Sequence, residues 1–195
     1  MNKLLGFFEL KDSMLPTIPW EIFNEDIKLN PNVLWTVRTA IYRGDDLNLP
    51  RRVGVSSVEA YDFALSTSRK YGENGMVLYY PYFIAEKSGT LNVFNNKVVI
   101  EAVKEDLWNL ATNSKCDCTL ILEKERKECI GDKSFLSDEE IGEIVSYVRE
   151  VKRMFRDDLI EGKSILLEWS FAFNCNKDKN KVGSRYLVFY EARTV

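Results

Sequence analysis

The two runs ILLEWSFAF (165–173) and RYLVFYEARTV (185–195) decide how the chain is interpreted. Both are rich in β-branched and aromatic residues, and a polar segment separates them, so they predict two antiparallel strands. Because side chains alternate along a strand, Glu168, Glu191 and Arg193 can share one sheet surface. Carboxylates and a guanidinium there suit a magnesium–polyphosphate site, which needs hard oxygens and a fixed cation. An ordinary cross-strand Glu–Arg pair on a half-solvated hairpin is the alternative.

Length and composition allow a sizeable core. The 195 residues are 45% hydrophobic and 12% aromatic, enough for one domain. The net charge of −3 gives no electrostatic reason to expect binding to nucleic acid or to an anionic membrane. No apolar run approaches the ~20 residues of a membrane span, and the N-terminus lacks a signal-peptide pattern. We therefore expect a cytoplasmic protein.

The sequence contains no histidine. The chain itself therefore offers no Ser–His or Cys–His nucleophile, no histidine metal ligand and no phosphohistidine. A zinc site would need all four cysteines, and their spacing does not match a zinc ribbon, so we expect reduced thiols. The cysteines are Cys116, Cys118, Cys129 and Cys175.

The first half of the chain predicts a strand, a loop and a helix. Three prolines in residues 1–32 disfavour a long helix, so we expect a loose lead-in segment. VLWTVRTA (33–40) predicts a strand, and 41–54 predicts a loop whose arginines could bind polyphosphate. A capping box, SSVE (56–59), opens a helix that should end near Tyr71.

The second half predicts more sheet and a longer helix. The run 76–86 is an aromatic strand with Pro81 inside it, which indicates a sheet edge or a bend. The run 88–103 predicts a hairpin. A second capping box, SDEE (137–140), precedes apolar residues at helical spacing and predicts a helix over 137–156. Together the patterns predict an α+β domain, a largely antiparallel sheet with two amphipathic helices packed on it.

Six segments in register resemble the ATP-grasp, nucleotide-binding portion of the phosphoenolpyruvate synthase and pyruvate phosphate dikinase family. The first is WTVRTAIYRGDDLNLPRRVGVSS, similar to the family's VRSSATAEDLPxxSFAGQ, and the second is MVLYYPYFIAEKSGTLNVF, similar to VVVQxMVxxxxSGVxFT. The family's IEAxxGLGExV corresponds to VVIEAVKEDLWNL, and its LSDEEIxELAxLxxxIExHF to SFLSDEEIGEIVSYVREVKRMF. The two terminal runs are similar to DIEWAxD and LYxLQxRP. The resemblance implies an ATP-grasp-like domain over 33–195 after the lead-in 1–32.

The resemblance also implies nucleotide-binding positions. Arg38 matches the family's phosphate-binding arginine, and Gly54 matches the glycine of the loop that covers the phosphates. Tyr80 to Phe83 match the hinge whose backbone meets adenine. The implied cofactors are ATP and Mg²⁺.

The terminal strands carry the implied metal ligands. Glu168 matches a metal-binding acid, and Glu191 and Arg193 match residues that contact metal or phosphates. Leu166 stands where the family has an aspartate, so one metal ligand of the family is missing. Glu191 replaces a glutamine, which could offset that loss or repel a triphosphate.

The implied function is a truncated, stand-alone ATP-binding module related to phosphoenolpyruvate synthase. It would support phosphoryl transfer with a partner protein that supplies a phosphohistidine or a lysine-bearing lobe. The alternative is a degenerate, non-catalytic scaffold or regulatory protein that retains the fold. A nucleotide is the expected ligand, with no nucleic acid and no membrane as partner.

Overall fold

The computed structural model describes residues 3–44, 49–107, 109–110, 116–124 and 126–195, and the chain divides into two compact units. Unit 1 comprises Met1–Thr17, Ala85–Ala172 and Tyr186–Val195. Unit 2 comprises Ile18–Ile84 and Phe173–Arg185. None of the described helices is long and apolar enough to cross a membrane.

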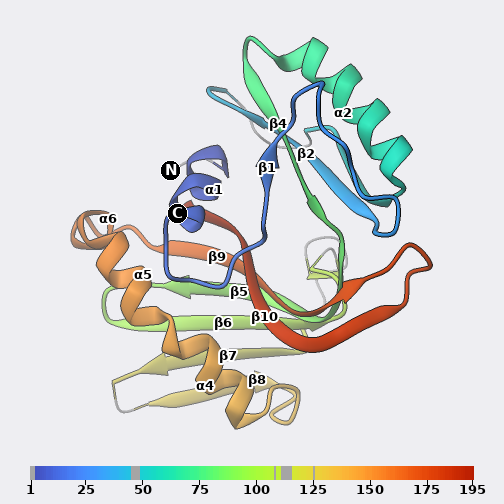
Figure 1. Cartoon of the computed structure of the whole chain (residues 1–195). Helices are drawn as coiled ribbons and strands as arrows, with labels where there is room; N and C mark the ends of the chain where they lie inside the picture. Colours follow the sequence, from blue (N-terminus) through green and yellow to red (C-terminus); the bar gives the residue numbers. More distant parts are fainter. Residues whose placement is uncertain (1–2, 45–48, 108, 111–115, 125) are drawn as a thin grey trace. The chain divides into compact units, whose positions relative to one another are not determined.

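Unit 1 is built on a six-stranded sheet with the strand order β10-β9-β5-β6-β7-β8 (Figure 1). The strands are β5 (Phe83–Val93), β6 (Lys97–Lys104), β7 (Cys118–Glu123), β8 (Lys127–Gly131), β9 (Ile165–Cys175) and β10 (Lys181–Thr194). The pairs β5–β6, β6–β7 and β7–β8 are antiparallel. The predicted hairpin over 88–103 is confirmed, and its turn is closed by Phe94 N, which donates to the carbonyl oxygen of Lys97 at 2.9 Å.

The two terminal runs are neighbouring strands, as predicted. At their outer end Ser164 and Val195 exchange two backbone hydrogen bonds of 2.9 Å, which is the pattern of an antiparallel pair. At the other end only residues 176–180 connect the strands. A parallel arrangement would need a crossover of about a dozen residues or more, so the pair is an antiparallel hairpin.

Three short helices replace the continuous helix predicted over 137–156: α4 (Asp138–Ser146), α5 (Val148–Met154) and α6 (Arg156–Ile160). The predicted capping box is confirmed, because Ser137 accepts from Glu140 N while the Glu140 side chain accepts from Ser137 N. The breaks fall at two aromatic residues. Tyr147 packs edge-on against Phe189 at 5.7 Å, and Phe155 has non-helical dihedrals and is buried. The breaks thus let both rings pack inward.

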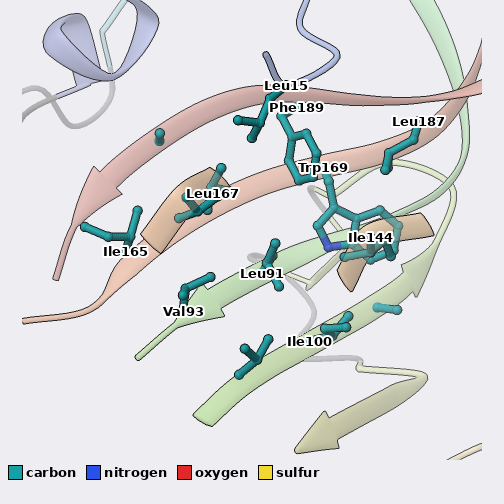
Figure 2. Close-up of a cluster of buried hydrophobic side chains, with 14 of the residues drawn as sticks. Leu15, Leu91, Val93, Ile100, Ile144, Ile165, Leu167, Trp169, Leu187 and Phe189 are labelled. Atoms are coloured by element: carbon teal, nitrogen blue, oxygen red, sulfur yellow. The ribbon is translucent and has the colours of Figure 1, made fainter. Parts of the chain in front are cut away.

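The three helices lie along one side of the six-stranded sheet, and the main core fills the space between them (Figure 1). Figure 2 shows Trp169 and Phe189 at its centre, with Leu91 and Ile144 beside them. Burial of each such side chain contributes roughly 1.5–3 kcal/mol. Gly89 is required here, because a Cβ at this position would lie 2.6 Å from the Trp169 ring.

The expectation of a loose lead-in over 1–32 is wrong for its first part. Residues Lys3–Lys11 form helix α1, which buries Leu4, Phe7 and Leu10. The helix ends before Pro16, so it is short enough to avoid the prolines that disfavour a long one. Leu10 belongs to the core of unit 1, which makes this segment part of the fold.

Unit 2 contains a four-stranded antiparallel sheet and helix α2 (Ser57–Tyr71), which packs on one face of the sheet (Figure 1). The strand order is β1 (Glu21–Ile22), β4 (Gly75–Pro81), β2 (Trp35–Ile41) and β3 (Arg51–Val55). The predicted N-cap is confirmed, since Ser56 accepts from Glu59 N. The predicted loop over 41–54 is wrong at its end, which forms β3, and its residues 45–48 lie outside the described part of the chain.

The buried Tyr79 of β4 should make the stability of unit 2 depend on alkaline pH. Burial, and then the hydrogen bond that its hydroxyl donates to Glu21 at 2.7 Å, raise the pKa of Tyr79 from 10.0 to about 12. Below pH 10 the hydroxyl is protonated in both states, so its contribution is complete. As the pH rises from 10 towards 12 the unfolded state ionises first, and roughly 2–3 kcal/mol of stability should be lost.

The measurement is the unfolding free energy of wild type and Tyr79→Phe against pH by denaturant titration. The variant lacks this ionisable hydroxyl, so its unfolding free energy minus that of wild type should rise above pH 10. Parallel curves for the two proteins would contradict the assignment.

Candidate functional site

The six-stranded sheet of unit 1 has one apolar and one polar face. Alternate residues of β9, including Leu167 and Trp169, belong to the core beneath α4–α6, so Glu168 and Ser170 point to the opposite face. The same alternation operates in β5 and β6. We call the following residues the polar face: Ser88, Thr90, Glu101, Glu168 and Ser170.

Hydrogen bonds between strands order the polar face. The hydroxyls of Ser88 and Ser170 lie 2.7 Å apart, and Thr90 donates to the Glu101 carboxylate at 2.9 Å. Glu101 was not among the predicted site residues. Its signal in the sequence is a lone acid at an alternating position of the strand VVIEAV, opposite Thr90 in the register. The face thus presents a fixed carboxylate beside neutral hydroxyls.

The predicted metal ligands, Glu168 and Glu191, come from neighbouring strands. Each lies four residues inward from the paired residues Ser164 and Val195, on strands that are neighbours in the sheet. Glu191 is only 1% exposed. A buried carboxylate is costly unless cations or hydrogen-bond donors stabilise it, and a bound Mg²⁺ would add to such stabilisation.

Arg193, two residues beyond Glu191, has a buried donor that is not used. Its Nε has no hydrogen-bond partner within the part of the chain that the structure describes. An unmatched buried donor costs roughly 1–3 kcal/mol, more when it is charged. A phosphate oxygen would supply the missing acceptor, and guanidinium–phosphate bonds are among the stronger hydrogen bonds in proteins.

In unit 2 the predicted residues Arg38 and Tyr80 share a face. Arg38 is opposite Leu78 in the β2–β4 register, and Tyr80 is two residues further along β4. The intervening residues Val37 and Tyr79 pack against α2, so Arg38 and Tyr80 are on the face away from that helix. An arginine and the start of the predicted hinge therefore lie on one surface.

Gly54 and the predicted hinge are in contact. Gly54 lies in strand β3 with φ +64°, and a Cβ there would lie 3.3 Å from the ring of Tyr82. Tyr82 stacks on Phe83 with 6.5 Å between the ring centres, and its backbone N donates to Leu34 O at 2.8 Å. A side chain at position 54 would meet both backbone strain and the Tyr82 ring.

The structure thus brings the predicted residues together in two sets. Unit 1 holds Glu168, Glu191 and Arg193, and unit 2 holds Arg38 and Gly54 with the hinge residues. Convergence of the two sets on one nucleotide site stays a prediction.

The predicted site residues do not line the following cavities. One of about 480 Å³ lies beside α2, and one of about 270 Å³ lies between β7–β8 and α4. Another of about 450 Å³ lies beside α1 and α5.

The donor set fits magnesium better than zinc. All four cysteines are free thiols, and no cluster of three or more His, Cys, Asp or Glu side chains suited to a metal ion occurs among the described residues. Mg²⁺ is usually held by one or two carboxylates together with substrate phosphates and water. Glu168 and Glu191 match that smaller requirement.

Comparison with known proteins identifies the fold. No protein-family model matches the chain, and no curated protein matches it significantly. The structure is similar to that of a D-alanine–D-alanine ligase from Helicobacter pylori, with TM-score 0.52 and 18% identity over 98% of this chain and 50% of that one. A D-alanyl-alanine synthetase A from Vibrio cholerae gives TM-score 0.50 and 9% identity, covering 98% and 54%. This chain therefore spans about half the length of either protein.

A macrocyclase from Microcystis aeruginosa, bound with its precursor peptide, gives TM-score 0.44 and 8% identity, covering 98% of this chain and 51% of that one. The chain has an α+β fold of the ATP-grasp type.

Proposed function

We propose that the chain binds ATP together with Mg²⁺. The observation that carries the proposal is the outer hairpin of the six-stranded sheet. There Glu168 and Glu191 lie on neighbouring strands, and Arg193 has a buried Nε that lacks an acceptor. Two carboxylates and a guanidinium are complementary to a magnesium ion and to phosphate oxygens, respectively.

Each residue has a role in this proposal. Glu168 and Glu191 would hold Mg²⁺, which would neutralise part of the triphosphate charge. Arg193 and Arg38 would bind phosphate oxygens, and Gly54 would allow close approach of the backbone. The backbone of Tyr80 to Phe83 would meet the adenine. Such a site would position the triphosphate and stabilise charge, the two contributions on which phosphoryl transfer depends.

The proposal extends to the group that accepts the phosphoryl group of ATP. The resemblance to phosphoenolpyruvate synthase and pyruvate phosphate dikinase supports phosphoryl transfer, and a partner would supply the accepting group because the chain has no histidine. The names of the two matched proteins, a D-alanine–D-alanine ligase and a D-alanyl-alanine synthetase, support an amino acid as the acceptor in place of a partner's histidine.

A non-catalytic scaffold is the second candidate. It is favoured by Leu166, an apolar residue where the resembling family has a metal-binding aspartate. A scaffold that has lost its ligand would show no saturable ATP binding at millimolar nucleotide, with or without Mg²⁺. Binding of ATP therefore separates the two candidates.

Arg38→Ala should weaken ATP·Mg²⁺ binding more than tenfold. Loss of a charge-assisted phosphate contact costs roughly 1.5–3 kcal/mol, and about 1.4 kcal/mol corresponds to a tenfold change in Kd. The measurement is calorimetric titration with ATP at saturating Mg²⁺.

Arg52→Ala is the matched control. Arg52 is opposite Val37 in the register, and its guanidinium lies over the Phe63 ring of α2 at 4.7 Å. It is therefore an arginine on the other face of the same sheet, and its removal should leave Kd within about twofold, because an exposed arginine outside the site contributes little. Equal effects of the two substitutions would refute the phosphate role of Arg38.

A further inference from the structure

The outer edge of β10 is contacted by the N-terminal segment Lys3–Thr17. β10 is the last strand of the six-stranded sheet, so one side of its backbone has no neighbouring strand. We call Lys3–Thr17 the N-terminal clasp. Its end forms an isolated parallel bridge to the strand, Thr17 to Phe189, in which Phe189 N donates to Pro16 O at 2.8 Å.

Helix α1 of the clasp contacts the same strand further along. Gly6 is packed so closely that an added Cβ would fall within bonding distance of the Ala192 carbonyl oxygen, and 3.3 Å from its nitrogen. Leu10, one turn later, joins the core cluster that includes Ala192. Glycine is therefore required at position 6 because helix and strand meet backbone to backbone.

The contact falls on a particular segment of β10. Ala192 lies between Glu191 and Arg193, the residues assigned above to magnesium and phosphate. An edge strand that is paired on one side only is prone to local opening. A site for a metal and its phosphate works only when its side chains are held within about 0.5 Å of the required geometry.

We propose that the N-terminal clasp is a positioning element that fixes Glu191 and Arg193 by holding the β10 backbone at Ala192. This inference rests on the proposed binding of ATP·Mg²⁺ at those residues. Gly6 is its positioning residue, since any side chain there would push the helix away from the strand.

The test uses Gly6→Ala in the full chain, with two controls. Gly142→Ala makes the same change in a helix of unit 1 where nothing lies within 4 Å of the new Cβ. Ile144→Val removes one methyl group from the core of the same unit, and so controls for a general loss of stability. Leu10→Val, a milder change at the α1 residue that shares a core cluster with Ala192, takes the place of Gly6→Ala if that variant does not fold.

Two readouts separate positioning from stability. Amide hydrogen exchange should become at least tenfold faster at Tyr190 to Arg193 in Gly6→Ala and stay near wild type in both controls. The gain in ATP affinity on adding Mg²⁺ should fall at least tenfold in Gly6→Ala alone. A structural role would lower the melting temperature without changing that gain.

Wild-type exchange rates in β10 of Gly6→Ala would overturn the inference, and so would faster exchange with an unchanged response to Mg²⁺. If wild type binds no ATP, the proposed function fails, while the exchange rates still decide whether the clasp orders β10.

Discussion

Replacing Lys87 by methionine should destabilise unit 1 by about 3–5 kcal/mol, because it leaves a buried carboxylate without its cation. Lys87 Nζ donates to Glu140 Oε2 and to the carbonyl oxygen of Phe135, both at 2.7 Å. The side chain of Glu140 is only 4% exposed. The pair ties strand β5 to the start of helix α4, since the same carboxylate accepts from Ser137 N.

Urea unfolding followed by tryptophan fluorescence measures the effect. Lys127→Met is the matched control, because its ammonium lies 3.3 Å from the exposed Asp138 and such surface pairs contribute little. The double variant Lys87→Met/Glu140→Gln should recover much of the loss, since a neutral amide can still accept from Ser137 N. A loss below about 1 kcal/mol for Lys87→Met would show that the buried pair is not significant.

Replacing Glu168 and Glu191 together by glutamine should weaken ATP·Mg²⁺ binding by more than about a hundredfold and remove its dependence on Mg²⁺. Each charge-assisted contact contributes roughly 1.5–3 kcal/mol, and two such losses amount to several tenfold steps in Kd. Glutamine keeps the size of glutamate, so the fold should persist. The effect should be absent when ATP is titrated without the metal.

The control for this double variant is Glu150→Gln. Glu150 pairs with Arg153 in α5, with 2.6 Å between the closest nitrogen and oxygen. This helix packs through Val151 on the apolar face of the six-stranded sheet, opposite the face of Glu168. Titrations at two Mg²⁺ concentrations compare the proteins. Equal dependence on Mg²⁺ in wild type and the double variant would rule out these carboxylates as the metal ligands.

Local patterns in the sequence predict much of the fold. The alternation in ILLEWSFAF gives a strand whose Trp169 side joins the core and whose other side carries Glu168 and Ser170, and the capping box at Ser137 gives the start of α4. Both patterns depend on residues within a few positions of one another. For the same reason they place Glu168 and Glu191 on neighbouring strands correctly.

Features that depend on distant contacts were missed. Helix α1 is stabilised by packing on Ala192, far away in the sequence, and its nine residues alone are too short to signal a stable helix. The break at Tyr147 depends on the ring of Phe189. The unmatched Nε of Arg193 depends on burial, which no local pattern shows.

The central claim is that this chain binds ATP with Mg²⁺ through the outer hairpin of the six-stranded sheet. Calorimetric titration of the purified chain with ATP, in the presence and absence of Mg²⁺, tests it most directly. The account predicts saturable one-site binding that is at least tenfold tighter with Mg²⁺, because the metal links the two carboxylates to the phosphates. No saturable binding at millimolar ATP with Mg²⁺, or binding of equal strength without the metal, would contradict it.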